Sequence, residues 1–186
     1  MNNTNEKIFI DGERIYLRRV MVSDVDTNYH RWMNDPEVTS YLESRFLSNG
    51  LESLRSYVEA MAKDRDNLFL GIILKEQDRH IGNIKLGPIN WIHRYGDIGI
   101  IVGEKDCWGK GYAAEAIGLL SRYAFDVMNL NKLTAGCYGK NIGSVKTFQK
   151  AGFSVEGVRE QQYICDGTYI YAVMMGMVRT ERKENG

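Results

Sequence analysis

The sequence predicts an α/β (α+β) fold: a mixed, mostly antiparallel central sheet of about six to seven strands flanked by helices. Two observations support this class. Short apolar or alternating runs recur along the chain, and helical periodicities separate them, with turn signals such as Asn34-Asp-Pro36 between the patterns. The chain has 186 residues and no repeat, low-complexity segment or linker, so we expect one domain over 1–186 with its core over about 14–179.

Local patterns predict the elements in chain order. Ser23 followed by Asp24 and Asp26 is typical of a helix start, because a hydroxyl caps free N–H groups and carboxylates favour the first turn. The first half is expected to contain a strand at Arg14–Arg18, helices at Val20–Trp32 and Leu51–Lys63, strands at Leu68–Leu74 and His80–Leu86, and a loop at Gly87–Arg94.

The second half has longer and clearer patterns. Asp166-Gly167 is a turn signal that predicts a hairpin between the last two strands. The expected elements are strands at Ile98–Gly103, Lys132–Tyr138, Phe153–Val158 and Tyr169–Arg179, with helices from about Ala113 to Met128 and at Ile142–Ala151.

The strongest functional pattern lies in Asp97–Ala116, where a strand leads through a glycine turn into a helix. The first N–H groups of a helix have no partner within it, and the helix dipole is positive there, so this position suits an anion. Gly109 and Gly111 allow close backbone approach, and Lys110 adds a positive charge. The turn therefore predicts a pyrophosphate site. The spacing fits neither a P-loop nor a dinucleotide fingerprint, because the Ser/Thr of the first and the third glycine of the second are missing.

Composition excludes several classes of function. Lys plus Arg equal Asp plus Glu at 24 each, so the formal net charge of zero gives no support for nucleic-acid or membrane binding. The three cysteines are far apart in sequence, which argues against a disulfide framework and against a metal site. The polar start MNNTNEKIF lacks the apolar centre of a signal peptide, and we expect a cytoplasmic protein.

Two segments together resemble the GNAT superfamily of N-acetyltransferases. WGKGYAAEA resembles its acyl-CoA signature, and Asn141-Ile-Gly-Ser144 followed by Lys150-Ala-Gly-Phe153 resembles its second signature. The resemblance spans about Arg14 to Val178 and is closest to the branch of ribosomal-protein N-terminal and spermidine acetyltransferases. HIGNIKLGPIN and NDPEVTSYLESRF are also similar to acetyltransferases of surface-sugar biosynthesis.

The resemblance implies acetyl-CoA as the acyl donor, with no metal, and a splayed pair of central strands. The implied strand beside pantetheine is Ile100, Ile101 and Val102, and its partner across the splay is Leu133–Tyr138. Trp108 stands where the signature usually has Gln or Arg, so one polar contact is missing. The remaining implied donor contacts are the backbone of Gly109, Lys110, Gly111, Tyr112 and Ala113, and the side chains of Asn141 and Ser144.

The resemblance leaves the proton chemistry open. Phe148 stands where many members of the superfamily place a tyrosine as general acid, so Ser144 or a bound water is the next candidate. Asp97 is a candidate base acting through water, although an exposed aspartate at a strand end is the alternative. Trp91, His93 and Tyr163 are candidates for lining the acceptor pocket.

The acceptor expected from the sequence is a primary amine of a small molecule, such as an amino sugar or a nucleotide-linked amino sugar. The alternatives are the α-amine of a protein N-terminus, a polyamine, or a silent acyl-CoA-binding module that Phe148 makes conceivable. Dimers are common in the superfamily, so a homodimer is one assembly that the resemblance implies.

Overall fold

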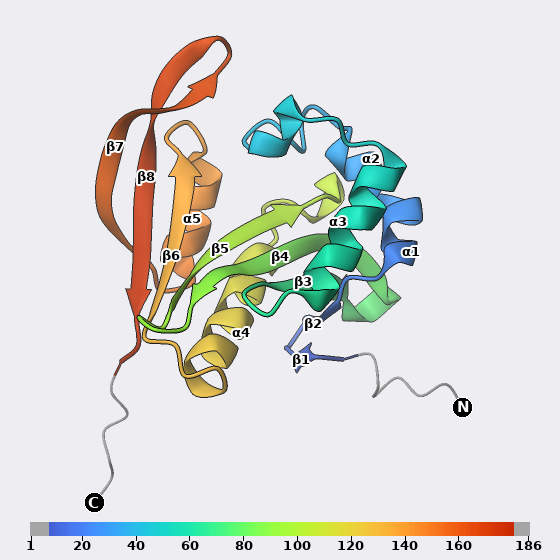
Figure 1. Ribbon diagram of the computed structural model, residues 1–186, viewed down its shortest axis with the longest axis horizontal. Helices are drawn as coiled ribbons and strands as arrows, with labels where there is room; N and C mark the ends of the chain where they lie inside the picture. The colour runs from blue at the N-terminus through green and yellow to red at the C-terminus, as the bar shows by residue number, and fades with distance from the viewer. Residues whose placement is uncertain (1–7, 181–186) are drawn as a thin grey trace, which may run out of the picture.

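All strands of the computed structural model, which describes residues 8–180, belong to one eight-stranded sheet with the order β1-β2-β3-β4-β5-β6-β8-β7 (Figure 1). Every neighbouring pair is antiparallel except β5 and β6. This confirms the fold class, with more strands than expected, because the two-residue β1 is too short for a pattern. The strands are β1 Ile10–Asp11, β2 Ile15–Arg19, β3 Leu68–Leu74, β4 Arg79–Asn90, β5 Tyr95–Val102, β6 Lys132–Tyr138, β7 Ser154–Cys165 and β8 Thr168–Val178.

Helices cover both sides of the sheet. Apolar side chains of α4 and α5 pack on one side, and those of η2, α2 and α3 pack on the other. Short 3-10 segments, η3 Glu43–Phe46, η4 Lys75–Gln77 and η5 Lys105–Cys107, lie in connections. The other helical elements are α1 Val22–Asp24, the π-helical η2 Val25–Tyr29, α2 His30–Met33, α3 Leu51–Lys63, α4 Tyr112–Asp126 and α5 Ile142–Lys150.

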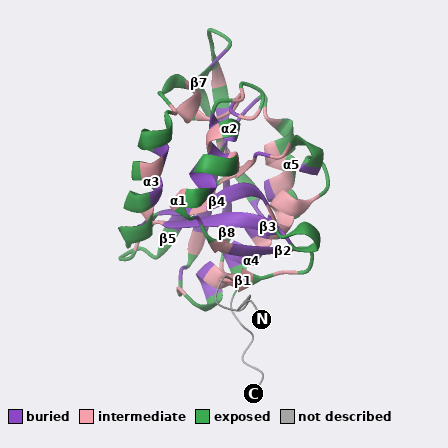
Figure 2. Ribbon diagram, turned by 90° about the vertical axis from the view of Figure 1, so that its right-hand side faces the viewer, coloured by how far each residue is buried: buried purple, intermediate pink, exposed green. Residues whose placement is uncertain are grey.

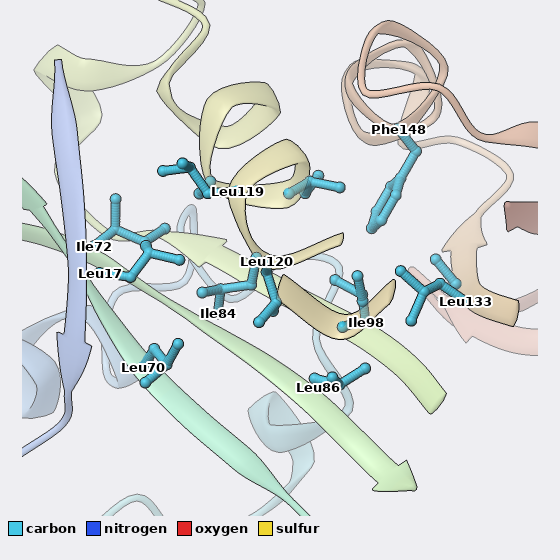
Figure 3. Packing of buried hydrophobic residues seen from close by; sticks show 14 of the residues in the cluster. Leu17, Leu70, Ile72, Ile84, Leu86, Ile98, Leu119, Leu120, Leu133 and Phe148 are labelled. Atoms are coloured by element: carbon cyan, nitrogen blue, oxygen red, sulfur yellow. The ribbon is translucent and has the colours of Figure 1, made fainter. Parts of the chain in front are cut away.

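The main core lies between the sheet and α4. Successive residues of a strand point to opposite faces, so Leu70 joins the cluster under α4 while Phe69 joins the smaller cluster under η2 and α3. Figure 3 shows Leu120 of α4 lying over Ile84 and Ile98 of the sheet, with Phe148 entering from α5. Fully burying one such side chain contributes about 1.5–3 kcal/mol, which fixes α4 against the sheet. Strands β3 and β4 are largely buried, and the exposed residues lie on the helices and loops and on the edge strand β7 (Figure 2).

The central pair β5 and β6 opens partway along its length. Parallel pairing joins Tyr95 to Lys132, Gly96 to Leu133 and Asp97 to Thr134, and it stops there. Both strands continue for several residues, β5 to Val102 and β6 to Tyr138, without pairing to each other. The backbone groups of these ends therefore face a gap between the strands, as the expected splayed pair requires.

Several element boundaries differ from the predictions. Gly87–Asn90 belongs to β4 and not to a loop, because a β-bulge between Leu86 and Ile89 absorbs Gly87 and Pro88 and lets pairing continue. Because pairing with β4 resumes beyond the bulge, β5 begins at Tyr95 and not at the expected Ile98. The expected N-cap Ser23 is wrong, since it lies inside α1. There the Asp24 carboxylate accepts the Met21 N–H at 2.7 Å and stabilises the helix start.

Candidate functional site

The predicted glycine turn lies between the end of β5 and the start of α4. Gly111 is the N-cap of α4 with φ +85°, and Gly109 has φ +71°, a region that side chains with a Cβ rarely enter. Nothing lies within 4 Å of a Cβ added at Gly109, so the backbone there is open to a ligand. The Trp108 side chain ties the start of the turn to the end of β5, because its Nε1 donates to the Val102 carbonyl at 2.7 Å. The first N–H groups of α4 therefore border this open turn, as an anion site requires.

A second segment braces this turn from outside. The Glu115 carboxylate, in the first turn of α4, accepts the backbone N–H of Arg14 at 2.8 Å and its Nε at 2.9 Å. Arg14 in turn donates from Nη1 to the Lys110 carbonyl at 2.9 Å. A Cβ added at Gly111 would lie 3.4 Å from Arg14 Nη2 and 3.6 Å from Lys150 Nζ. Two cations thus stand beside the turn, and the sequence alone indicated neither of them.

The turn opens into a cleft of about 740 Å³ between the splayed strands and α5. All the residues expected to contact the donor line this cleft except Lys110, whose backbone lies in the turn while its side chain does not line the cleft. The segment before η3 also lines the cleft, with Glu37, Val38, Ser40, Tyr41 and Leu42. Its lining from the donor prediction is Ile100, Ile101, Val102, Trp108, Gly109, Gly111, Tyr112, Ala113, Asn141 and Ser144.

The beginning of α5 borders the middle of the cleft. Asn141 is the N-cap of α5, and its Oδ1 accepts the Ser144 N–H at 3.0 Å, which leaves the side-chain amide N–H groups as its donors toward the cleft. Ser144 Oγ lies 3.4 Å from Cys137 Sγ, and burial raises the pKa of the Cys137 thiol. Phe148 is 2% exposed and packs edge-on against Phe153, so it serves the core while also lining the cleft.

A second hollow, of about 580 Å³, lies where the β5–β6 pairing stops. Asp97 and Thr134 line it, whereas Ile98, next to Asp97, and Gly136, two residues after Thr134, line the cleft. Thr134 Oγ1 donates to Asp97 Oδ1 at 2.8 Å. Burial raises the pKa of the Asp97 carboxyl, and the hydrogen bond from Thr134 opposes the shift in part. The other lining residues are Pro88, Ile89, Asn90, Tyr95, Glu156, Arg159, Met174 and Met175.

The three expected acceptor residues separate in space. Trp91, which is 48% exposed, and His93 lie in the turn between β4 and β5, and neither lines either hollow. This turn precedes β5, whereas the glycine turn follows it, so the length of β5 lies between them. Tyr163 of β7 also lines neither hollow, but it lies beside the splay, because a Cβ added at Gly136 would stand 3.0 Å from its hydroxyl and Gly136 lines the cleft.

Tyr163 belongs to a group of three tyrosines with Tyr138 and Tyr41. Its ring stacks on Tyr138 at a centroid distance of 4.2 Å, and Tyr41 lies 5.9 Å from Tyr138. Burial raises the pKa of Tyr163, and the carboxylates of Glu43 and Asp97 add to the shift. Sequence patterns did not indicate Tyr138 or Tyr41 as site residues, because they come from a buried strand end and an irregular segment.

The described residues contain neither a metal-binding cluster nor a helix that could cross a membrane. Between residues 8 and 180, no cluster of three or more His, Cys, Asp or Glu side chains is placed to hold a metal ion. Within the same range, no helix has the length and apolar character needed to cross a membrane.

Comparison with known proteins identifies relatives over most of the chain. The model of the acetyltransferase (GNAT) domain matches residues 14–154. The uncharacterized N-acetyltransferase p20 of Bacillus licheniformis is 30% identical over 172 residues, covering 91% of this chain and 95% of the relative. Spermidine N(1)-acetyltransferase of Escherichia coli K12 is 35% identical over 94 residues, 50% of each chain. The crystal structure of Vibrio cholerae spermidine N-acetyltransferase in complex with CoA and spermine has a TM-score of 0.79 at 24% identity, covering 89% of this chain and 95% of that one.

Proposed function

Because the chain belongs to the GNAT acetyltransferase family and takes its acyl group from acetyl-CoA, we propose that its acceptor is a primary amine of a polyamine. The observation that carries this proposal is the group of carboxylates and tyrosine rings on the acceptor side of the splay. The names of the relatives support a polyamine over the amino sugar that the sequence analysis favoured.

On the donor side, the proposal assigns the pyrophosphate to the N–H groups of Gly109–Ala113. Three features support it: the two positive-φ glycines, the N-terminus of α4, and the cations Arg14 and Lys150 beside the turn. The edge of β5 at Ile100 and Ile101 is not paired with β6 and can hydrogen-bond an extended amide chain as an added strand would, while the Val102 carbonyl accepts from Trp108. The amide group of Asn141 and the hydroxyl of Ser144 face the same cleft further along.

On the acceptor side, the proposal assigns amine binding to Asp97, Glu43 and the stacked rings of Tyr138 and Tyr163. The carboxylates carry this assignment by charge attraction, because Tyr163 stacks on one face of Tyr138 and Arg45 lies over the Tyr138 ring at 5.5 Å. An aromatic face that stays open would add about 0.5–2 kcal/mol for a cation. Both carboxylates lie near enough to Tyr163 to raise its pKa. A polyamine has several ammonium groups, and carboxylates at two separate points suit it better than a ligand with a single charge.

Asp97 is proposed as the base that takes a proton from the attacking amine, directly or through water. An amine with a pKa of about 10 must lose a proton before or during attack on the thioester. Burial raises the pKa of Asp97 and makes its carboxylate a stronger base than an exposed aspartate. Its position where β5 and β6 part places it beside the opening in which the thioester would lie.

An acceptor panel tests the proposal. Release of the CoA thiol is followed with acetyl-CoA and spermidine, a monoamine of similar length, an amino sugar, a nucleotide-linked amino sugar, and a peptide with a free N-terminus. The proposal expects spermidine to have the highest kcat/KM. Preference for a sugar amine or for the peptide would contradict it in favour of the alternatives from the sequence. Tight acetyl-CoA binding with no thiol release for any amine would instead indicate a silent binding module.

Three further predictions have not been tested. We propose that the chain is a single domain over 1–186, which the one continuous sheet over the described residues supports. A homodimer and a cytoplasmic location also stay predictions.

A further inference from the structure

We infer that the hydroxyl of Tyr163, from β7, protonates the departing CoA thiolate. The inference rests on the acetyl transfer itself and not on which amine accepts the group. The side chains of α5 near the cleft are poor proton donors. Phe148 has no proton to give, and the Ser144 hydroxyl is an alcohol, a much weaker acid than a phenol, whose pKa is about 10.

Backbone geometry brings the Tyr163 hydroxyl to the splay. A bulge interrupts β7, since Arg159 pairs with Ala172 and Tyr163 with Ile170, and Gln161 between them has φ +51°. Beyond the bulge, the Tyr163 side chain lies over Gly136, where a Cβ would stand 3.0 Å from the hydroxyl. Gly136 lines the donor cleft on the unpaired part of β6. The absence of a side chain at this position leaves room for the phenol beside the opening.

The surroundings hold the phenol in place. Its ring stacks on Tyr138 at 4.2 Å with an interplanar angle of 12°. Arg45 of η3 donates from Nη2 to the carbonyl of Ile164 at 2.6 Å, which ties the neighbouring residue of β7 to η3. These contacts come from two other elements, β6 and η3, and hold the ring and the neighbouring backbone without using the Tyr163 hydroxyl.

The charges around Tyr163 favour its protonated form. The groups that face it are Glu43 of η3, Asp97 of β5, and Tyr138 and Cys137 of β6, with Arg45 over the Tyr138 ring. Burial, then these acidic groups, raise the pKa of Tyr163. A phenol with the ordinary pKa of about 10 is already protonated at neutral pH, and these groups keep Tyr163 in that form although they make it a weaker acid.

Acetyl transfer forms one bond, breaks one bond and moves two protons. The amine nitrogen bonds to the thioester carbonyl carbon, and one N–H proton passes to Asp97 or to water. The C–S bond then breaks, its electron pair stays on sulfur, and the Tyr163 O–H proton moves to that sulfur. Asp97 releases the amine's proton to solvent, and solvent returns a proton to the tyrosinate. The products are the acetylated amine and the free CoA thiol.

The test compares two donors with different leaving groups in the full-length enzyme and its variants. Tyr163→Phe removes only the hydroxyl and keeps the stacked ring, so the melting temperature should not change. With acetyl-CoA and the best amine of the panel, kcat should fall about 10²-fold or more, while KM for acetyl-CoA stays within about twofold. The control Tyr169→Phe changes an exposed tyrosine of β8 and should leave kcat unchanged.

The second donor separates an acid from a structural role. S-acetyl-4-nitrothiophenol releases a stable thiolate that needs no proton, so wild type and Tyr163→Phe should turn over at equal rates with it. Gly136→Ala, which sets a methyl group against the hydroxyl, should lower kcat with acetyl-CoA and not with this donor. Equal loss with both donors would overturn the inference, as would an unchanged kcat of Tyr163→Phe with acetyl-CoA. Loss in Ser144→Ala in place of Tyr163→Phe would assign the proton to Ser144.

Discussion

Replacement of Gly111 by alanine tests whether the turn before α4 is the pyrophosphate site. Gly111 has φ +85°, and a residue with a Cβ in the left-handed region costs about 1–2 kcal/mol. Steric contact adds little, because the new Cβ would lie 3.4 Å from Arg14 Nη2, the end of a flexible side chain. The backbone strain can have either of two effects. The turn either keeps its shape and the fold loses stability, or it relaxes and its N–H groups move away from the anion.

Each effect can be measured, the first as a change in melting temperature and the second as a change in the Kd for acetyl-CoA. If the shape is kept, about 1–2 kcal/mol lowers the melting temperature by about 2–8 °C in a chain of this length. If the turn relaxes, the Kd for acetyl-CoA rises about 5- to 30-fold, since 1.4 kcal/mol is tenfold. Calorimetry and isothermal titration on the same samples should therefore show losses that sum to about 1–2 kcal/mol.

A matched control lies two turns along the same helix. Gly118 sits inside α4 with no atom within 4 Å of an added Cβ, so Gly118→Ala should stabilise the fold by about 0.5–1 kcal/mol and leave the Kd unchanged. Gly111→Asp adds a carboxylate to the turn, and its Kd should rise further than that of Gly111→Ala. Wild-type stability together with wild-type affinity in Gly111→Ala would refute the placement of the pyrophosphate.

Three further predictions concern side chains around the cleft. Asp97→Asn should lower kcat at neutral pH and remove the acidic limb of its pH profile, which lies above the ordinary aspartate range because burial raises the pKa of Asp97. The same raised pKa means that ionising Asp97 costs stability as the pH rises through the folded value, so the asparagine variant should melt no lower than wild type at pH 7. Glu115→Gln should raise KM for acetyl-CoA about 2- to 5-fold with kcat unchanged, because its partly exposed pair with Arg14 is worth about 0.4–1 kcal/mol. Glu43→Gln should raise KM for spermidine more than for a monoamine; an equal effect on both would remove Glu43 from amine recognition.

The donor half of the site could be predicted from sequence because it is local. Gly109 and Gly111 need positive φ, and the helical spacing that follows them announces the start of α4 within a few residues. The same holds for Asn141, whose place at the start of α5 follows from its capping of Ser144. The brace formed by Arg14 was missed, since its partner Glu115 is 101 residues away and no local pattern joins them.

Longer-range geometry explains the errors in the strands. Gly87 and Pro88 read as a break, because a sequence pattern cannot show that a bulge absorbs both residues and that Ile89 pairs again with Gly96. Trp91 and His93 were expected at the acceptor pocket on that basis, and the extended β4 instead carries their turn to the far end of β5 from the glycine turn. The bulge in β7 is equally invisible to a sequence pattern: it brings Tyr163 opposite Ile170, where regular pairing after Arg159 would place Gln161.

The two halves of the site should therefore diverge differently among related chains. The donor half depends on backbone N–H groups and glycine conformation, and few substitutions preserve those, so similarity in sequence carries the donor from one relative to the next. The proposed acceptor half is made of side chains from four separate segments, at Glu43, Asp97, Tyr138 and Tyr163, and none of them depends on a glycine conformation. A charge change at Glu43 alone would alter the attraction for a second ammonium group while leaving the splay intact. For this reason, the identity of the amine must be sought in these four positions and not in the glycine turn.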